Sequence, residues 1–230
     1  DTVSKTAGGS FDSAVTMSSG LRVADGGNIG SASDTDAMAI SSGGVVTFSQ
    51  KPVFPTATLG MTLLQTVTAD DDTTVTVGSS SLFTTDYKTY QIHCLNIHPA
   101  TNTVEFRCRM SKGGSVISAD YEYARFQSVH SSSPGTTRGN GSDDHVNLAE
   151  SVGNAGEASV SGVHILYNPA ETTFRKFVNY NSVSMDVNAN FANNVGMYVH
   201  EGSNAAIDGI QFFFSLGNVS TGTFKLYGIA

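Results

Sequence analysis

Tryptophan is absent from this sequence, and charged side chains, cysteines and prolines are scarce. Only 14% of the 230 residues are charged, and 12 basic residues stand against 20 acidic ones, for a formal net charge of −8. Such a chain lacks the basic patch that recognition of DNA or RNA requires. No apolar run approaches the roughly 20 residues of a membrane-spanning helix. We therefore expect neither a nucleic acid nor a membrane as partner.

The two cysteines, Cys94 and Cys108, are too few for a disulfide framework. Both lie on the apolar phase of runs that we predict to be paired strands, residues 90–94 and 104–108. In a simple hairpin centred near Thr101 they would lie opposite each other, either as buried free thiols or as a disulfide. We favour free thiols. A zinc site needs about four ligands at metal spacing, and the sequence does not offer them.

Helical periodicity is also missing, because no long run of Leu, Ala, Glu and Lys repeats at helical spacing. Instead, bulky side chains recur at every second residue, the period at which one face of a strand is buried. From about Leu59 onward, turn-rich spacers separate these runs, and the last two are predicted to form a hairpin. The predicted strands are residues 63–67, 73–77, 89–96, 103–110, 121–129, 158–167, 173–180, 182–187, 195–200, 210–214 and 223–227.

Strands at this spacing, without the helices that a parallel sheet would need, predict an all-β domain. We expect an antiparallel two-sheet β-sandwich, with a jelly roll as the first choice of topology and another sandwich as the second. Two long polar loops interrupt the strands, at residues 131–147 and 151–157.

The composition changes near residues 52–55, which divides the chain into an N-terminal segment, residues 1–58, and a sandwich domain, residues 59–230. The apolar stretches of the first segment are too short to close a core within one chain. Three chains side by side would complete such a core, whereas the alternative is a flexible Ser/Gly-rich linker. Residue 1 is Asp, which leaves open whether a leader precedes it. The candidate trimer-interface residues are Leu21, Val23, Ile29, Ile40, Val46, Phe48, Val53 and Phe54.

Three separated stretches carry a family resemblance: Asn-Ile-His-Pro-Ala-Thr at 96–101, residues 165–176, and the ending IQFFFSLGN followed by GTFKLYGI. In this order they are similar to the C-terminal β-domain of virion structural proteins of tailed bacteriophages, such as capsid decorations and fibres of aquatic phages. The resemblance covers about Leu63 to Ile229. Residues 19–54 likewise resemble the shaft or collar segment ahead of that domain. The matched residues start turns and strands, so they mark a fold and not a catalytic site.

The resemblance implies a non-enzymatic homotrimer on the virion surface, with a jelly-roll domain after an extended trimerising segment. As a capsid decoration or short fibre it would bind the major capsid protein or a tail or head attachment protein. The alternatives are a tail-fibre protein that binds host surface glycans and a secreted carbohydrate-binding module. The last should expose a row of aromatic side chains, whereas Tyr87, Tyr90, Tyr121 and Tyr123 fit core or strand positions.

Candidate chemistry is sparse. Loops on a rigid sandwich are common recognition sites. The first polar loop is either such a site or a mobile insertion without a function. Its candidate recognition residues are Arg138, Asn140, Asp143, Asp144 and His145. Two carboxylate clusters, at 70–72 and 143–145, are more typical of solvated turns than of Ca²⁺ sites. The sequence shows no paired carboxylates beside an aromatic groove, no nucleophile elbow and no phosphate-binding loop. We predict no catalytic residue, cofactor or metal, and keep a hydrolase with distant carboxylates as a minor alternative.

Overall fold

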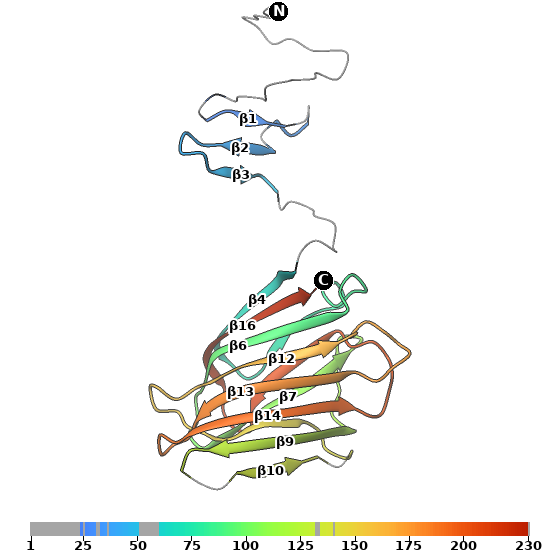
Figure 1. Ribbon diagram of the computed structural model, residues 1–230. Coiled ribbons are helices and arrows are strands. Elements are labelled where there is room, and N and C mark those ends of the chain that lie inside the picture. Colours follow the sequence, from blue (N-terminus) through green and yellow to red (C-terminus); the bar gives the residue numbers. More distant parts are fainter. Residues whose placement is uncertain are drawn as a thin grey trace, which may run out of the picture. The chain divides into compact units, whose positions relative to one another are not determined.

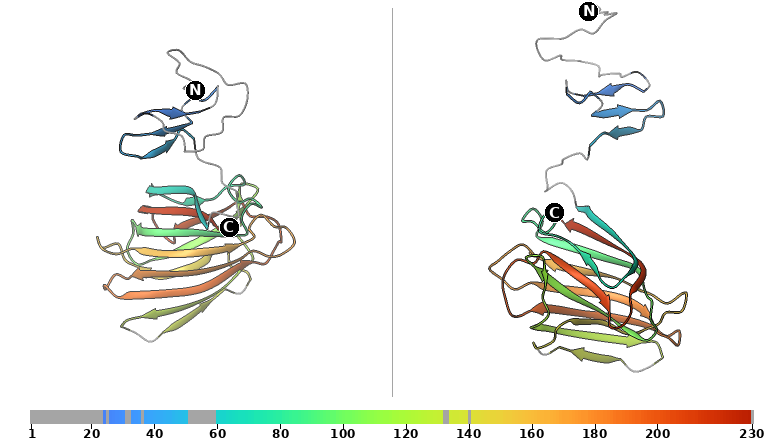
Figure 2. Two further views of the ribbon diagram at one scale, coloured as in Figure 1. Left: turned by 45° about the horizontal axis from the view of Figure 1, so that its top comes forward. Right: turned by 180° about the vertical axis from the view of Figure 1, so that it is seen from behind.

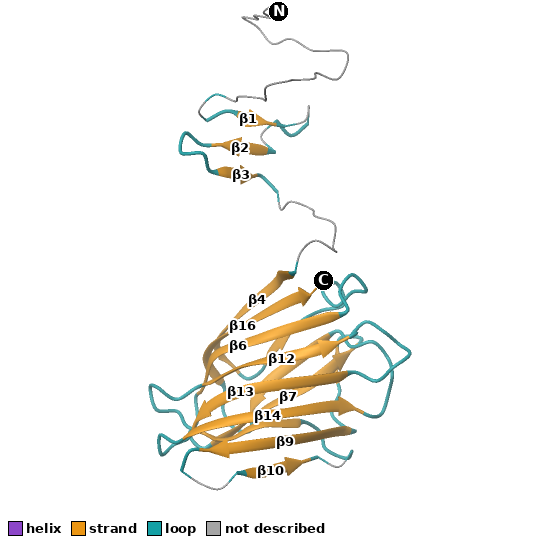
Figure 3. Ribbon diagram, in the orientation of Figure 1, coloured by secondary structure: helices purple, strands orange, loops and turns teal. Residues whose placement is uncertain are grey.

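The computed structural model describes residues 24, 26–30, 33–35, 37–50, 60–131, 134–139 and 141–229. All regular structure in these residues is strand, and no helix occurs among them (Figure 3). The chain divides into two units, residues 1–54 and 55–230. The predicted boundary at residue 58 falls in the stretch 51–59, which lies outside the described residues.

The N-terminal unit contains a small antiparallel sheet in the order β1-β2-β3. Its strands are β1 (Asn28–Ile29), β2 (Met38–Ile40) and β3 (Val46–Phe48). The turn between β2 and β3 is closed by a hydrogen bond from the Gly44 amide to the Ser41 carbonyl at 3.0 Å. Gly44 has a φ of 79°, a conformation that glycine adopts without steric cost. The apolar stretches around Ile40 and Phe48 thus form short strands.

The second unit is a sandwich of two antiparallel sheets. The large sheet has the order β10-β9-β14-β13-β12-β6-β16-β4, and the small sheet the order β11-β7-β15-β5, with β8 paired to β7. In Figure 1 the large sheet faces the viewer, and the view from behind in Figure 2 shows the second layer against it. The strands are β4 (Met61–Asp72), β5 (Val75–Val77), β6 (Thr89–Pro99), β7 (Val104–Lys112), β8 (Ser115–Val116), β9 (Tyr121–Val129), β10 (Gly135–Arg138), β11 (Val146–Val152), β12 (Val160–Tyr167), β13 (Phe177–Met185), β14 (Phe191–His200), β15 (Gly209–Phe214) and β16 (Val219–Ile229).

Four nested strand pairs identify the topology as a jelly roll. Strand β4 pairs with β16 and β5 with β15, so the start of the unit lies beside its end. Inside these pairs, β6 pairs with β12 and β7 with β11. One antiparallel ribbon rolled across two sheets produces this pattern. The predicted all-β, jelly-roll sandwich is therefore confirmed.

Two insertions into the jelly roll widen the large sheet. Strands β9 and β10 lie between β7 and β11 in sequence, and β13 and β14 lie between β12 and β15. All four join the large sheet beyond β12, in the order β13, β14, β9 and β10. The large sheet consequently has eight strands and extends beyond the small one.

The core lies between the sheets and is formed by the inward phase of the strands. Buried side chains include Ile92, Phe106, Tyr198, Phe212 and Phe224. His164 of β12 is also buried, with its ring stacked on Tyr180 at a centroid distance of 5.4 Å and edge-on to Phe212 at 5.1 Å. Tyr90 and Tyr121 are fully buried and Tyr87 and Tyr123 half-buried, which confirms the predicted core or strand positions of these tyrosines.

A buried arginine fastens the added strands to the small sheet. The Arg125 side chain, on β9, is fully buried and forms an ion pair with Glu150 of β11. Its Nη1 donates to Asn147 Oδ1 at 3.0 Å, and its Nη2 donates to Thr137 Oγ1 at 2.9 Å. Because burying an unpaired charge is costly, these partners offset the desolvation of the guanidinium.

The two predicted hairpins are wrong. Strands β6 and β7, which carry Cys94 and Cys108, belong to different sheets, and so do β15 and β16. The reason is the rolled topology: each strand takes partners from distant parts of the sequence, and the short connection crosses between layers. Both cysteines are nevertheless buried free thiols, as predicted.

Two further predictions need correction. Residues 173–180 and 182–187 were expected to form separate strands, but a single strand, β13, spans Phe177–Met185. The polar stretch 131–147 was expected to be a loop, yet it contains β10, which pairs with β9. Backbone pairing at a free sheet edge needs no apolar side chains, so the hydrophobic pattern did not reveal it.

Candidate functional site

A groove lies on the solvent-facing side of the large sheet, and we call it the β13–β14 groove. It has a volume of about 460 Å³, within the range of small-ligand sites. It is lined by Ser128, His130, Glu157, Ser159, Ser161, Val183, Ser184, Met185, Phe191, Ala192 and Asn193.

The turn between β13 and β14 is fixed by Asp186. Its Oδ1 accepts hydrogen bonds from the amides of Asn188 and Asn190, each at 2.8 Å. Its Oδ2 accepts from the Asn190 side-chain amide at 2.9 Å. These bonds hold the strand ends from which Met185 and Phe191 enter the groove. The adjacent wall comes from the connection that precedes β12, which contributes Glu157 and Ser159.

Phe191 and His130 form an aromatic side of the groove. The His130 amide donates to the Phe191 carbonyl at 3.0 Å, and the Phe191 amide donates to His130 Nδ1 at 3.3 Å. Their ring centroids are 5.9 Å apart, and Phe191 is 65% exposed. An exposed ring beside hydroxyl and amide groups provides one apolar face and several hydrogen-bonding groups. This combination suits a flat, polar ligand with one apolar side, such as a sugar ring.

The groove does not have the usual arrangement for cleaving a glycoside. That reaction commonly uses two carboxyl groups placed about 5 to 10 Å apart. Glu157 is the only carboxylate among the residues that line the groove. The lining therefore supports binding better than hydrolysis.

The predicted recognition residues do not gather into one site. Arg138 is exposed at the end of β10, and Asn140 lies outside the described residues. The carbonyl of Asp143, which is half-buried, accepts a hydrogen bond from the Tyr121 amide at 3.2 Å. The carboxylate of Asp144 pairs with Arg109 and with His145. The His145 hydrogen bond, together with Arg109, holds the pKa of Asp144 below its usual value. The recognition role of this loop stays a prediction.

The predicted trimer residues fall into two groups. Ile29 and Ile40 are half-buried within the small N-terminal sheet, whereas Val46 and Phe48 are exposed on it. Leu21, Val23, Val53 and Phe54 lie outside the described residues. Their role in trimerisation stays a prediction.

Within the described residues of the chain, no three His, Cys, Asp or Glu side chains come together in a way that would hold a metal ion. Over the same ranges, no helix has the length and apolar character to span a membrane.

The sequence analysis does not predict the groove, because it assigns each strand one buried face and one solvated face. In β14, Ala192, Asn194 and Tyr198 point into the sandwich, while Phe191 and Val195 point out. Apolar residues at both inward and outward positions of a strand indicate that the solvent-facing side of the sheet is also apolar.

The sequence matches no protein-family model, and the searches of curated proteins and of solved structures returned no similar protein.

Proposed function

We propose that the protein is a structural component of a tailed-bacteriophage virion, a homotrimeric capsid decoration or short fibre on the particle surface. The three sequence stretches described above support this role, and a jelly roll is a common architecture of viral structural proteins. In this role the protein contributes binding area between other virion proteins and needs no active site.

The observation that carries the proposal is the exposed apolar surface of the N-terminal sheet. Val45 is 63% exposed, Val46 47% and Phe48 49% in the single chain. Three short strands cannot bury such side chains by themselves. Neighbouring copies of the same segment would supply the missing contacts, as in a trimeric shaft.

The test is to locate the protein on purified particles of a phage whose genome encodes it. Immunoelectron microscopy with an antibody against the chain should label the head or a fibre at regular positions. An antibody against an internal virion protein is the control, because it should label only disrupted particles. Particles that lack the chain would contradict the proposal.

A second candidate function, recognition of a host surface glycan, is favoured by the exposed Phe191 ring in the β13–β14 groove. Binding of the wild-type protein to host envelope polysaccharide should be saturable. Phe191→Ala should weaken it at least tenfold, since one stacked ring contributes on the order of 1 kcal/mol or more. Phe174→Ala is the matched control, because Phe174 is also highly exposed but lies outside the groove.

Equal binding by both variants would contradict a glycan site in this groove. Steady release of reducing sugar from the polysaccharide would instead place the protein among the hydrolases.

A further inference from the structure

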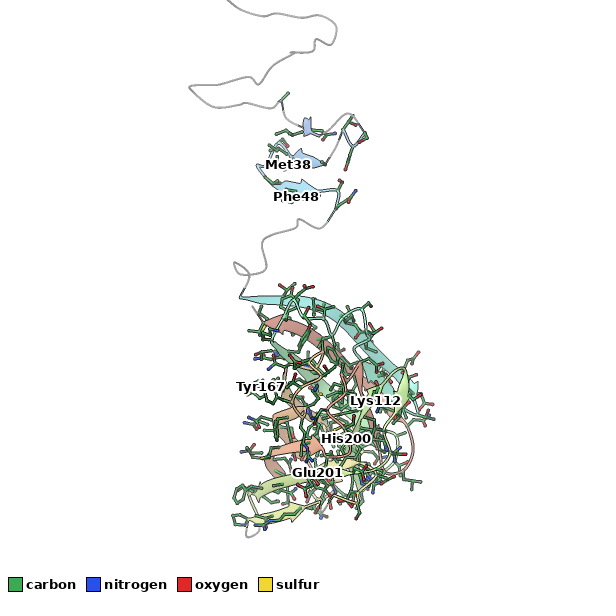
Figure 4. All side chains as sticks on the ribbon, turned by 90° about the vertical axis from the view of Figure 1, so that its right-hand side faces the viewer. Met38, Phe48, Lys112, Tyr167, His200 and Glu201 are labelled. Atoms are coloured by element: carbon green, nitrogen blue, oxygen red, sulfur yellow. The ribbon has the colours of Figure 1, made fainter. Side chains whose placement is uncertain are left out.

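The solvent-facing side of the large sheet is a broad apolar surface, which we call the outer face. Figure 1 shows it toward the viewer, and no other strand of this unit crosses it. In Figure 4 Tyr167 lies on this side of the sandwich, whereas Lys112 of β7 lies on the opposite side. Its large apolar side chains are Met61, Leu63, Leu95, Phe126, Val163, Ile165, Tyr167, Phe177, Val183, Phe191, Val195, Met197, Tyr227 and Ile229.

The strand register joins these side chains into rows across the sheet. In one row Phe126 of β9 is opposite Val195 of β14, and Asn181 of β13 is opposite Val163 of β12. In the next row Met197 and Ile165 both lie opposite Asn179. In antiparallel sheets with one solvated face, the outward positions are ordinarily polar. The outer face breaks that rule over most of its strands, which marks an interaction surface.

Charge is scarce on the central strands of the outer face. On the outward positions of β14, β13, β12, β6 and β16, Lys225 is the only charged side chain. Lys225 lies opposite His93 in the register. Burial, and next the charge of Lys225, lowers the pKa of His93, so His93 is neutral at pH 7. The other outward residues of these strands are apolar, hydroxyl or amide side chains.

This charge pattern points to a second copy as the occupant. Each copy carries a formal net charge of −8, so identical chains repel one another except through surfaces that lack charge. A strongly charged partner would instead be met by a surface that carries the opposite charge. The amides of Asn179 and Asn181 can both donate and accept hydrogen bonds, which suits contact with the polar side chains of a neighbouring copy.

The area is also sufficient. The seven spacings of about 4.8 Å between eight strands, and six or seven residue steps of about 3.3 Å along them, give a face of about 700 Å². A stable interface of standard size takes about 800 Å² from each partner. The face therefore provides the area that a specific contact between two chains needs.

We propose that the outer face of the large sheet is the surface through which copies of this chain bind one another. The inference builds on the proposed function only in adding a second contact surface of the homotrimer to the N-terminal sheet. Self-association in solution does not depend on a place in the virion, so the two proposals can fail separately.

The experiment measures the mass of the full-length protein by size-exclusion chromatography with light scattering. The wild type should have about three times the 24.1 kDa of one chain. The double variant Val195→Asp/Met197→Asp should elute as a monomer, because it places four or more like charges in each contact. Both side chains are exposed in the single chain, at 43% and 44%, so the fold itself should tolerate the change. Circular dichroism checks this.

The matched control is Val116→Asp/Leu216→Asp, on β8 of the small sheet and in the connection between β15 and β16, where the side chains are also exposed, at 40% and 66%. It should keep the oligomer. A second face variant, Asn179→Asp/Asn181→Asp, replaces side chains that are already polar and exposed, and it should also dissociate the oligomer. It provides the test should the first variant fail to fold.

A monomeric wild type would overturn the inference. So would an oligomer that both face variants retain, or one that the control variant dissociates as fully as the face variants do. Loss of the oligomer in a folded face variant, with the oligomer of the control variant intact, supports the inference, and location on a virion is not needed for that result.

Discussion

Lowering the pH from 7 to 5 should destabilise the jelly roll through one buried side chain, His164. This residue is 1% exposed, and its ring is packed between Tyr180 and Phe212. The Tyr198 hydroxyl lies 3.3 Å from its Nδ1, which is its polar contact in the core. Burial lowers the pKa of His164 to about 3, so the folded protein keeps this ring neutral.

The magnitude follows from the difference between the folded and unfolded states. An unfolded chain protonates histidine with a pKa of about 6.5. Between about pH 6.5 and pH 3 the unfolded chain therefore binds a proton at His164 that the folded chain does not bind. The free energy of unfolding falls as the pH falls through this window. Between pH 7 and pH 5 the loss is about 2 kcal/mol.

The assay is urea unfolding at pH 7, 6 and 5, at one protein concentration, for the wild type and for His164→Phe. Phenylalanine keeps a flat ring in the aromatic cluster but cannot bind a proton. His93 and His200, whose pKa values burial also lowers, are present in both proteins and cancel in the comparison. The wild type should lose about 2 kcal/mol more than the variant. Equal losses in the two proteins would refute the reasoning.

Three further predictions concern closely packed residues of the sandwich. Arg125→Met should lower the free energy of unfolding by about 2 to 4 kcal/mol, because it removes the buried ion pair and hydrogen bonds between β9 and β11. Arg138→Met, on an exposed arginine, should change it by less than about 0.5 kcal/mol, and similar losses in both variants would contradict this account. Cys94 and Cys108 should resist a thiol reagent in the native protein, because both are buried and burial raises the pKa of Cys108 to about 12. Both should react after unfolding, and no reaction after unfolding would reveal a disulfide. Gly196→Ala should lower the Tm by several degrees, because a Cβ there would lie 2.5 Å from a backbone oxygen of β9, and an unchanged Tm would show that the sheet adapts.

Alternation of apolar and polar residues was sufficient to predict the class of fold. In the strands that contain Phe212 and Phe224, buried side chains recur at every second residue. This period is a local property, because successive side chains of a strand point in opposite directions. The buried positions of Tyr90 and Tyr121 followed from the same pattern. Location on a virion, trimerisation through residues such as Phe48 and the recognition loop around Asp143 stay predictions.

Strand partners, in contrast, depend on contacts between residues far apart in the sequence. Ile92 lies opposite His164, and Cys108 lies opposite Val146, each dozens of residues away, so the nearest strand in sequence was a poor guide to their partners. The β13–β14 groove joins residues from 128 to 193, and no local pattern brings them together.

By itself the sequence determined that the chain forms strands, where most of them lie, and which side chains alternate along each, because these properties arise within a few residues. Only the tertiary structure decided which strands pair, which of the two apolar phases faces the core, and that the other phase forms an apolar outer face with little charge on its central strands. That choice depends on how the sheets roll and pack, which places Val195 and Met197 toward solvent and Tyr198 in the core.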